Sequence, residues 1–300
     1  MSTPTPTLAA TEESLRDIVA TKYFFLASLT MMLYDHALTF PQEVQVIWKR
    51  KKTYISYLFF LVRYYSVLAM IVITFGFFSP ELTREDCSHW MLFLPLGCTL
   101  VLTLLPGILM SIRVSAVYNG NPYLLCGLLT LLAAQAGAGL WQYTVKGGTP
   151  APDPVDNYNF HFCIYLPPKS LGTRSIMYIS MEVAFDSLVF LLTVARTTYL
   201  FLARTPRARL HREEGGGGTG STGSEGQGSS LLLNLVRDGV FYFGAIFSIN
   251  LAWVIMILHA PTGLRATAAI PGGCFMATMI CRITINLRTT AYGPARLDEL

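Results

Sequence analysis

Two carboxylates, Glu182 and Asp186, lie four residues apart within a long apolar stretch of the chain. In an α-helix this spacing puts both side chains on one face. Carboxylates that face lipid are costly, so we expect this face to point into a helical bundle. There the pair binds a proton or a small ligand, or serves only as structural hydrogen-bond acceptors; the spacing favours neither. Asn250 is a third candidate for the same site, although such amides commonly join neighbouring helices.

A second set of polar residues lies near the other ends of the apolar stretches. Asp35 and Arg63 occupy similar depths in two successive stretches, so we predict that they pair. Arg196 and Arg282 lie at a comparable depth, and Asn286 follows Arg282 at the helical spacing of four residues. The alternative is that the three arginines extend their guanidinium groups to lipid phosphates at the membrane surface.

Six cysteines fall into two sets. Cys87 and Cys163 lie in stretches expected on the outer, oxidising side, where they can form a disulfide. A competing interpretation joins them to His89 and His161 as four zinc ligands, although spacers of one residue are unusual in structural zinc sites. The disulfide would exclude the metal. The other four cysteines lie in apolar stretches and behave as small apolar residues.

The chain contains none of the common catalytic motifs: no HExxH, no GxSxG and no Walker loop. We therefore expect no enzyme activity, no catalytic residue, no cofactor and no resident metal. The formal net charge is only +4, and the basic residues are not interleaved with aromatic ones as in a nucleic-acid interface. Nucleic acid is excluded as an expected partner.

Composition decides the class of protein. The chain is 52% hydrophobic and only 13% charged, whereas charged residues make up about a quarter of soluble domains. We expect an all-α integral membrane protein, a seven-helix bundle, because a bilayer crossing needs about 20 apolar residues. The predicted spans are 18–40, 57–78, 90–112, 123–143, 176–202, 240–259 and 266–287.

The loops predict the orientation and the domain limits. Twelve Lys and Arg residues fall in one set of loops and seven in the other, which places the N-terminus outside and the C-terminus in the cytosol. Residues 1–17 and 288–300 are expected to be polar tails on the bundle of residues 18–287, and 213–230 a flexible cytosolic loop rich in Gly and Ser. The host membrane is the plasma membrane or an endomembrane.

Basic residues near the inner surface are expected to contact lipid headgroups. Residues 41–52 predict a short helix that starts at Pro41, lies in the headgroup region and carries Val44, Ile47 and Trp48 on one side. A solvated basic loop is the alternative. The candidate headgroup contacts are Lys49, Arg50, Lys51, Lys52, Arg207 and Arg209.

Short matches spread over the chain point to a family. They are Tyr34-Asp35, Leu38-Thr39, Glu43-Val44, the run Ile47 to Lys51 and Arg63-Tyr64, and later Arg113-Val114, Ala116 to Tyr118, Arg237 to Gly239, Tyr242-Phe243, Arg282 and Asn286 to Arg288. On these residues the chain resembles a fungal multi-pass membrane family whose N-terminal region, here about 23–67, is the domain of unknown function DUF6533. The resemblance implies a helical bundle and brings no established activity, substrate or site residue.

Three functions remain open. The first is a seven-helix, receptor-like or sensor protein that has Glu182 and Asp186 in a polar cavity; it rests on the helix count and orientation, which is an argument from fold alone. The second is a small proton-coupled transporter or permease that uses the same carboxylates. The third is a scaffold that grips anionic lipids. The bilayer is the expected partner, together with an unidentified small ligand or cytosolic protein.

Overall fold

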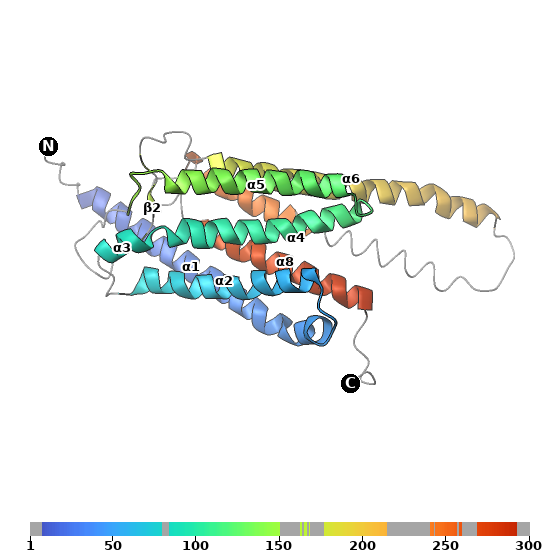
Figure 1. Ribbon diagram of the computed structural model, residues 1–300, viewed down its shortest axis with the longest axis horizontal. Coiled ribbons are helices and arrows are strands. Elements are labelled where there is room, and N and C mark those ends of the chain that lie inside the picture. The colour runs from blue at the N-terminus through green and yellow to red at the C-terminus, as the bar shows by residue number, and fades with distance from the viewer. Residues whose placement is uncertain are drawn as a thin grey trace.

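A computed structural model describes residues 8–79, 84–150, 163, 165–166, 168, 177–214, 241–242, 244–256, 258–259 and 269–292. Its helices lie side by side along one long axis (Figure 1). Within the described residues, strands occur only as the short β1 (Thr149–Pro150) and β2 (Tyr165–Leu166), which pair antiparallel. The architecture is all-α, as predicted.

Most helices are long. In chain order they are α1 (Leu8–Glu43), η1 (Val44–Trp48), α2 (Tyr54–Phe78), α3 (Arg84–Trp90), η2 (Phe93–Leu100), α4 (Val101–Val117), α5 (Pro122–Thr144), α6 (Met177–Glu214) and α8 (Ala269–Tyr292). The segments η1 and η2 are π-helical. A shorter apolar helix, Gly244–Met256, lies between α6 and α8 in the chain.

Five segments are long and apolar enough to cross a bilayer: Tyr54–Phe78, Glu85–Val117, Pro122–Thr144, Met177–Tyr199 and Ile270–Thr290. They correspond to the second, third, fourth, fifth and seventh predicted spans, and they make the chain a multi-pass membrane protein. The first predicted span lies within α1, where Lys22, Asp35 and His36 lower the hydropathy. The sixth overlaps the apolar helix Gly244–Met256, and the described residues 241–242 and 258–259 on either side of it are helical too.

Helix continues beyond several of the predicted span ends. α1 begins at Leu8, so part of the expected polar tail is helical. α6 runs to Glu214, through the basic stretch and into the first residues of the predicted flexible loop. Residues 215–230 of that loop lie outside the described residues. A span predicted from hydropathy ends where apolar residues end, whereas a helix ends only where its backbone hydrogen bonds end.

Pro41 does not start a separate helix, which corrects the prediction for residues 41–52. α1 runs through Pro41 to Glu43, and η1 follows at once. Proline lacks the N–H for an α-helical hydrogen bond, and the chain widens into a π-turn directly afterwards. Val46 and Ile47 are buried there, whereas Trp48 is 49% exposed. One side of this segment therefore packs into the core, while Trp48 remains on the surface.

Prolines also lie inside other helices. Pro95 lies in the π-helical η2 and Pro106 inside α4. Pro271 lies in α8, close to Ala269, the first residue described in that helix.

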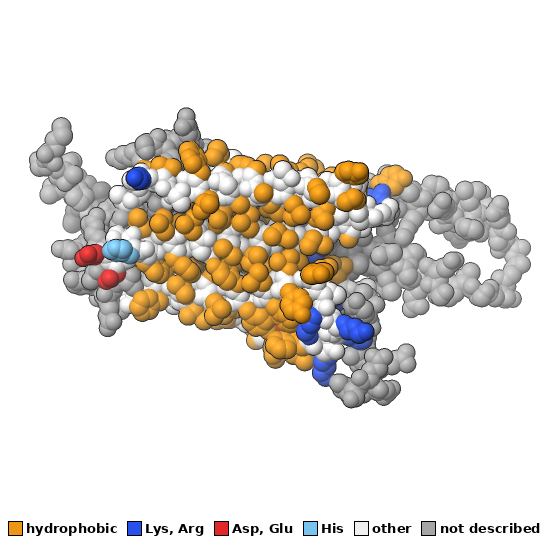
Figure 2. All heavy atoms as spheres, viewed as in Figure 1, with side chains coloured by type: hydrophobic (Ala, Val, Ile, Leu, Met, Phe, Trp, Pro, Cys, Tyr) orange, Lys and Arg blue, Asp and Glu red, His pale blue; other side chains and the backbone are white. Residues whose placement is uncertain are grey.

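α8 is the central helix of the bundle. Its span is 61% buried, against 22% for α5, and it packs on α1, α2 and α4. Figure 2 shows apolar side chains across the middle of one face, acidic groups at one end and most Lys and Arg groups at the other. We call these the disulfide end, which holds Cys87 and Cys163, and the basic end, which holds Lys49, Arg50, Lys51 and Lys52.

A close approach between α5 and α6 depends on one glycine. A Cβ atom added at Gly139 would lie 2.7 Å from Cδ2 of Tyr178 and 2.9 Å from Cδ1 of Leu100. Gly137 has no atom within 4 Å of such a Cβ. Ala133 and Ala134, on the preceding turn of α5, are exposed.

We expect Gly139→Ala to lower the free energy of unfolding by about 1–3 kcal/mol, because overpacking forces backbone or ring to move. Gly137→Ala is the matched control on the same helix. It should leave stability unchanged or raise it by up to about 1 kcal/mol, since alanine is the better helix former. Thermal unfolding of the detergent-solubilised protein measures both. Equal midpoints for the two variants would contradict the contact.

Candidate functional site

An ion pair is buried between α1 and α2. Glu43 is the last residue of α1, and Arg63 lies in the middle of α2. Arg63 Nε is 2.7 Å from Glu43 Oε2, and the two side chains are 1% and 0% exposed. Burial removes the hydration of both charges, so such a pair needs further hydrogen bonds to hold it.

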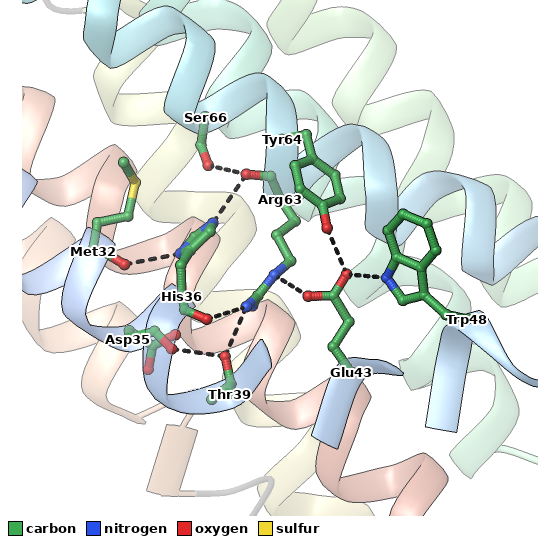
Figure 3. A network of polar contacts seen from close by, with 9 residues as sticks. All are labelled: Met32, Asp35, His36, Thr39, Glu43, Trp48, Arg63, Tyr64 and Ser66. Carbon is green, nitrogen blue, oxygen red and sulfur yellow. Dashed lines mark hydrogen bonds and ion pairs between the residues drawn. The ribbon is translucent and has the colours of Figure 1, made fainter. Parts of the chain in front are cut away.

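The carboxylate of Glu43 has those bonds (Figure 3). Its Oε1 accepts from the Trp48 indole Nε1 at 2.9 Å and from the Tyr64 hydroxyl at 2.9 Å. The π-turn η1 brings Trp48 back over the end of α1. The carboxylate is therefore held by α1, η1 and α2 together.

The guanidinium of Arg63 is held by α1. Nη2 donates to the Thr39 hydroxyl at 2.8 Å and to the His36 carbonyl at 3.0 Å. The His36 ring closes the contact, with Nε2 3.1 Å from the Arg63 carbonyl oxygen and Nδ1 2.8 Å from that of Met32. Ser66 also donates to the Arg63 carbonyl, at 2.8 Å. These bonds join α1 to α2 over two helical turns.

Asp35 pairs with Arg282 of α8 and not with Arg63, so the predicted Asp35–Arg63 pair is wrong. Asp35, Thr39 and Glu43 follow one another at intervals of four and form a stripe on α1. Arg63 reaches the two members nearer to η1, which leaves Asp35 for Arg282. The stripe thus links α1 to both α2 and α8. We call the whole set the Arg63 network: Asp35, His36, Thr39, Glu43, Trp48, Arg63, Tyr64, Ser66 and Arg282.

Residues 23–68 match a family of unknown function, DUF6533. This confirms the resemblance that the sequence predicted for this region. No curated protein and no solved structure matches the chain. Every residue drawn in Figure 3 lies inside the DUF6533 region; of the Arg63 network, only Arg282 lies outside it. The region is thus the part of the chain that builds the buried ion pair.

Sequence reasoning missed Glu43, Trp48 and Tyr64 as members of the site within the DUF6533 region. Glu43 was assigned to a surface helix because Pro41 precedes it. The available signal was its spacing of eight residues from Asp35, which repeats the helical interval twice.

The other candidate polar residues near the basic end also bind protein groups. Arg196 Nε donates to the Val117 carbonyl at 3.2 Å, and its guanidinium lies 5.3 Å from the Tyr118 ring centre. Asn286 Nδ2 donates to the Tyr242 hydroxyl at 3.3 Å. Arg63 is buried, so the alternative in which the arginines reach lipid phosphates is wrong for it.

Arg113 was counted as a loop residue, yet its guanidinium enters the bundle. It donates to the Thr284 hydroxyl of α8. It therefore adds a contact between α4 and α8 that the sequence did not predict.

The candidate headgroup contacts differ in their surroundings. Lys49 and Lys51 are exposed. Lys52 Nζ donates to the Ile47 carbonyl at 2.9 Å, so this ammonium caps η1. Arg207 and Arg209 lie on the part of α6 that extends past Tyr199.

Glu182 and Asp186 both lie in the bundle, 3% and 4% exposed. Asp186 Oδ2 accepts from Nδ2 of Asn250, which joins α6 to the Gly244–Met256 helix. The structure thus brings two of the three candidates for a ligand or proton site, Asp186 and Asn250, into direct contact, and the third, Glu182, shares a cavity with Asn250. No Lys or Arg among the described residues forms an ion pair with either carboxylate.

Glu182 lines an enclosed cavity of about 10 Å³, together with Thr99, Thr103, Asn250 and Trp253. A volume of this size has room for one water molecule. Glu182 Oε2 and Trp253 Nε1 are buried without a hydrogen-bond partner. One water can donate to the first and accept from the second.

Cys87 and Cys163 form a disulfide, with Cα atoms 5.6 Å apart. The bond ties α3 to the segment that follows β1. Because both sulfurs are consumed, the four-ligand zinc site that we considered as an alternative is excluded. His161, one of its ligands, lies outside the described residues.

Proposed function

We propose that the chain crosses the membrane seven times, with its N-terminus outside and its C-terminus in the cytosol, and that it acts as a receptor-like or sensor protein. α1 and the Gly244–Met256 helix would add two spans to the five apolar ones. α1 begins at the disulfide end and α8 finishes at the basic end (Figure 1), as an odd number of crossings requires. Basic loops are retained in the cytosol, and disulfides form outside it.

The Arg63 network carries the proposal of a sensor. Charged groups within the membrane are expensive and mark function by default. A well-packed apolar pair at Glu43 and Arg63 would often be as stable or more stable, so stability alone gives no reason for the ion pair. Its contacts join α1, α2 and α8 close to the basic end, where cytosolic partners would bind. A switch needs such a link between helices, whose contacts can be exchanged when the helices move.

Tagging of the two termini tests the topology. We expect a tag on the N-terminus to be accessible on intact cells and one on the C-terminus to be accessible only after permeabilisation. Both tags on the same side would overturn the seven-span arrangement.

The sensor proposal predicts that the Glu182–Asp186 pair is coupled to the basic end, where the Arg63 network lies, and this coupling can be tested. Spin labels at Lys51 and at Thr205 on α6 would report distances at the basic end of the full-length protein in nanodiscs, with the exposed Cys126 replaced by Ser. We expect the double variant Glu182→Gln/Asp186→Asn to add a second distance population. Ser187→Ala is the control, because among the described residues that hydroxyl donates to the Val183 carbonyl of its own helix, at 2.6 Å, and bonds to no other helix. An unchanged distribution in the double variant would overturn the coupling.

A permease is the second candidate, and the cavity beside Glu182 favours it. In proteoliposomes with a pH gradient, a permease would lose proton flux in the same double variant, with no change of distance at the basic end. A scaffold would show neither effect and would keep its association with anionic vesicles. Either result would contradict the sensor proposal and support the permease or the scaffold in its place.

A further inference from the structure

An apolar groove lies between α1 and α2 on the lipid-facing surface. Its volume is about 630 Å³, within the range of about 300–1,000 Å³ that small-molecule sites occupy. Ile71 and Phe75 are 59% and 61% exposed, so the groove is open to the membrane. Its main apolar lining residues are Leu29, Leu33, Val67, Ile71, Phe75 and Phe78.

The groove has the shape of two ridges with a gap between them. Residues 29 and 33 are one helical turn apart on α1, and residues 67, 71, 75 and 78 follow one face of α2. The two helices make few contacts with each other, because α1 packs mainly on α8, and α2 packs on α4 and α8. At the disulfide end Phe25 closes the gap, with its ring centre 5.2 Å from that of Phe77. A flexible apolar chain fits between such ridges better than a flat or polar molecule.

Lys22 lies at the closed end of this groove. Its Nζ is 5.4 Å from the ring centre of Phe78, which lines the groove. Within the described residues Lys22 forms no ion pair. A lysine at this depth extends its ammonium toward the membrane surface, where the available anions are lipid phosphates.

We propose that the groove is a phospholipid site, with one acyl chain between α1 and α2 and the phosphate on Lys22. The apolar walls recognise the chain, and the ammonium recognises the phosphate. A sterol would fill similar walls but would offer Lys22 only an uncharged hydroxyl in place of the phosphate anion. The bound lipid would join α1 to α2 at the disulfide end, as the Arg63 network does near the basic end. The proposal does not depend on the sensor function.

Native mass spectrometry of the full-length protein tests the site, after purification in mild detergent with equal amounts of phosphatidylcholine and a sterol. We expect the wild type to retain one phospholipid. Ile71→Trp fills the groove and should abolish retention. Leu191→Trp is the matched control, because Leu191 is 62% exposed on α6, away from the groove; it should retain the lipid. Lys22→Gln should weaken binding severalfold, because the lipid phosphate loses a charge-assisted hydrogen bond.

Three results would overturn the proposal. One is equal retention of phospholipid by the wild type and Ile71→Trp. Another is retention of the sterol in place of the phospholipid. The third is undiminished phospholipid affinity in Lys22→Gln. Because Ile71 and Leu191 are both exposed apolar positions, matching thermal midpoints for their variants would separate loss of the site from loss of the fold.

Discussion

Replacing Glu43 by Gln is expected to lower the free energy of unfolding by about 3–5 kcal/mol, because the change leaves the buried guanidinium of Arg63 without its counter-ion. Gln can keep the hydrogen bonds from Trp48 and Tyr64, so the loss reports the missing charge. Equilibrium unfolding of the full-length protein in mixed micelles measures the effect.

Two further variants make this result specific. Glu85→Gln removes an exposed carboxylate and should change stability by less than about 0.5 kcal/mol. In the double variant Glu43→Gln/Arg63→Met both charges are gone, so its cost should be well below the sum of the two single changes. Additive effects would mean that Glu43 and Arg63 contribute independently, contrary to the ion pair.

Loss of the disulfide should have the next largest effect. Cys87 and Cys163 are separated by 76 residues, and a cross-link over such a loop stabilises a fold by about 2–4 kcal/mol. We expect Cys87→Ser to lower the free energy of unfolding by this amount. The double variant with Cys163→Ser should cost no more than either single change, because one bond is lost in each case. Non-reducing mass mapping would verify the bond.

The free, exposed Cys126 supplies the control for that measurement. Cys126→Ser should leave the unfolding midpoint unchanged. If Cys87→Ser matches it, the disulfide does not stabilise the fold.

The sequence predicts the helices of this protein better than the contacts between them. Long apolar runs place the spans, because a membrane core accepts little else. The burial of Glu182 and Asp186 follows from their spacing of four residues, since one face of α6 must avoid lipid. These inferences need only the local sequence and the fact that lipid surrounds the helices.

Partners across helices need information that the local sequence lacks. Equal depth in the membrane made Asp35 and Arg63 a plausible pair, but depth does not say which helices are neighbours around the bundle. Arg282 approaches Asp35 because α8 packs on α1, a contact between residues 247 positions apart in the chain. The local sequence also does not predict the π-turn after Pro41, which brings Trp48 to Glu43.

The length of α6 has a mechanical consequence. Its apolar part stops at Tyr199, yet the helix continues to Glu214, which adds about 22 Å at 1.5 Å per residue. In the sensor proposed above, this extension would carry movement of the bundle into the cytosol. A tilt of about 10° within the bilayer would displace its tip by roughly 4 Å.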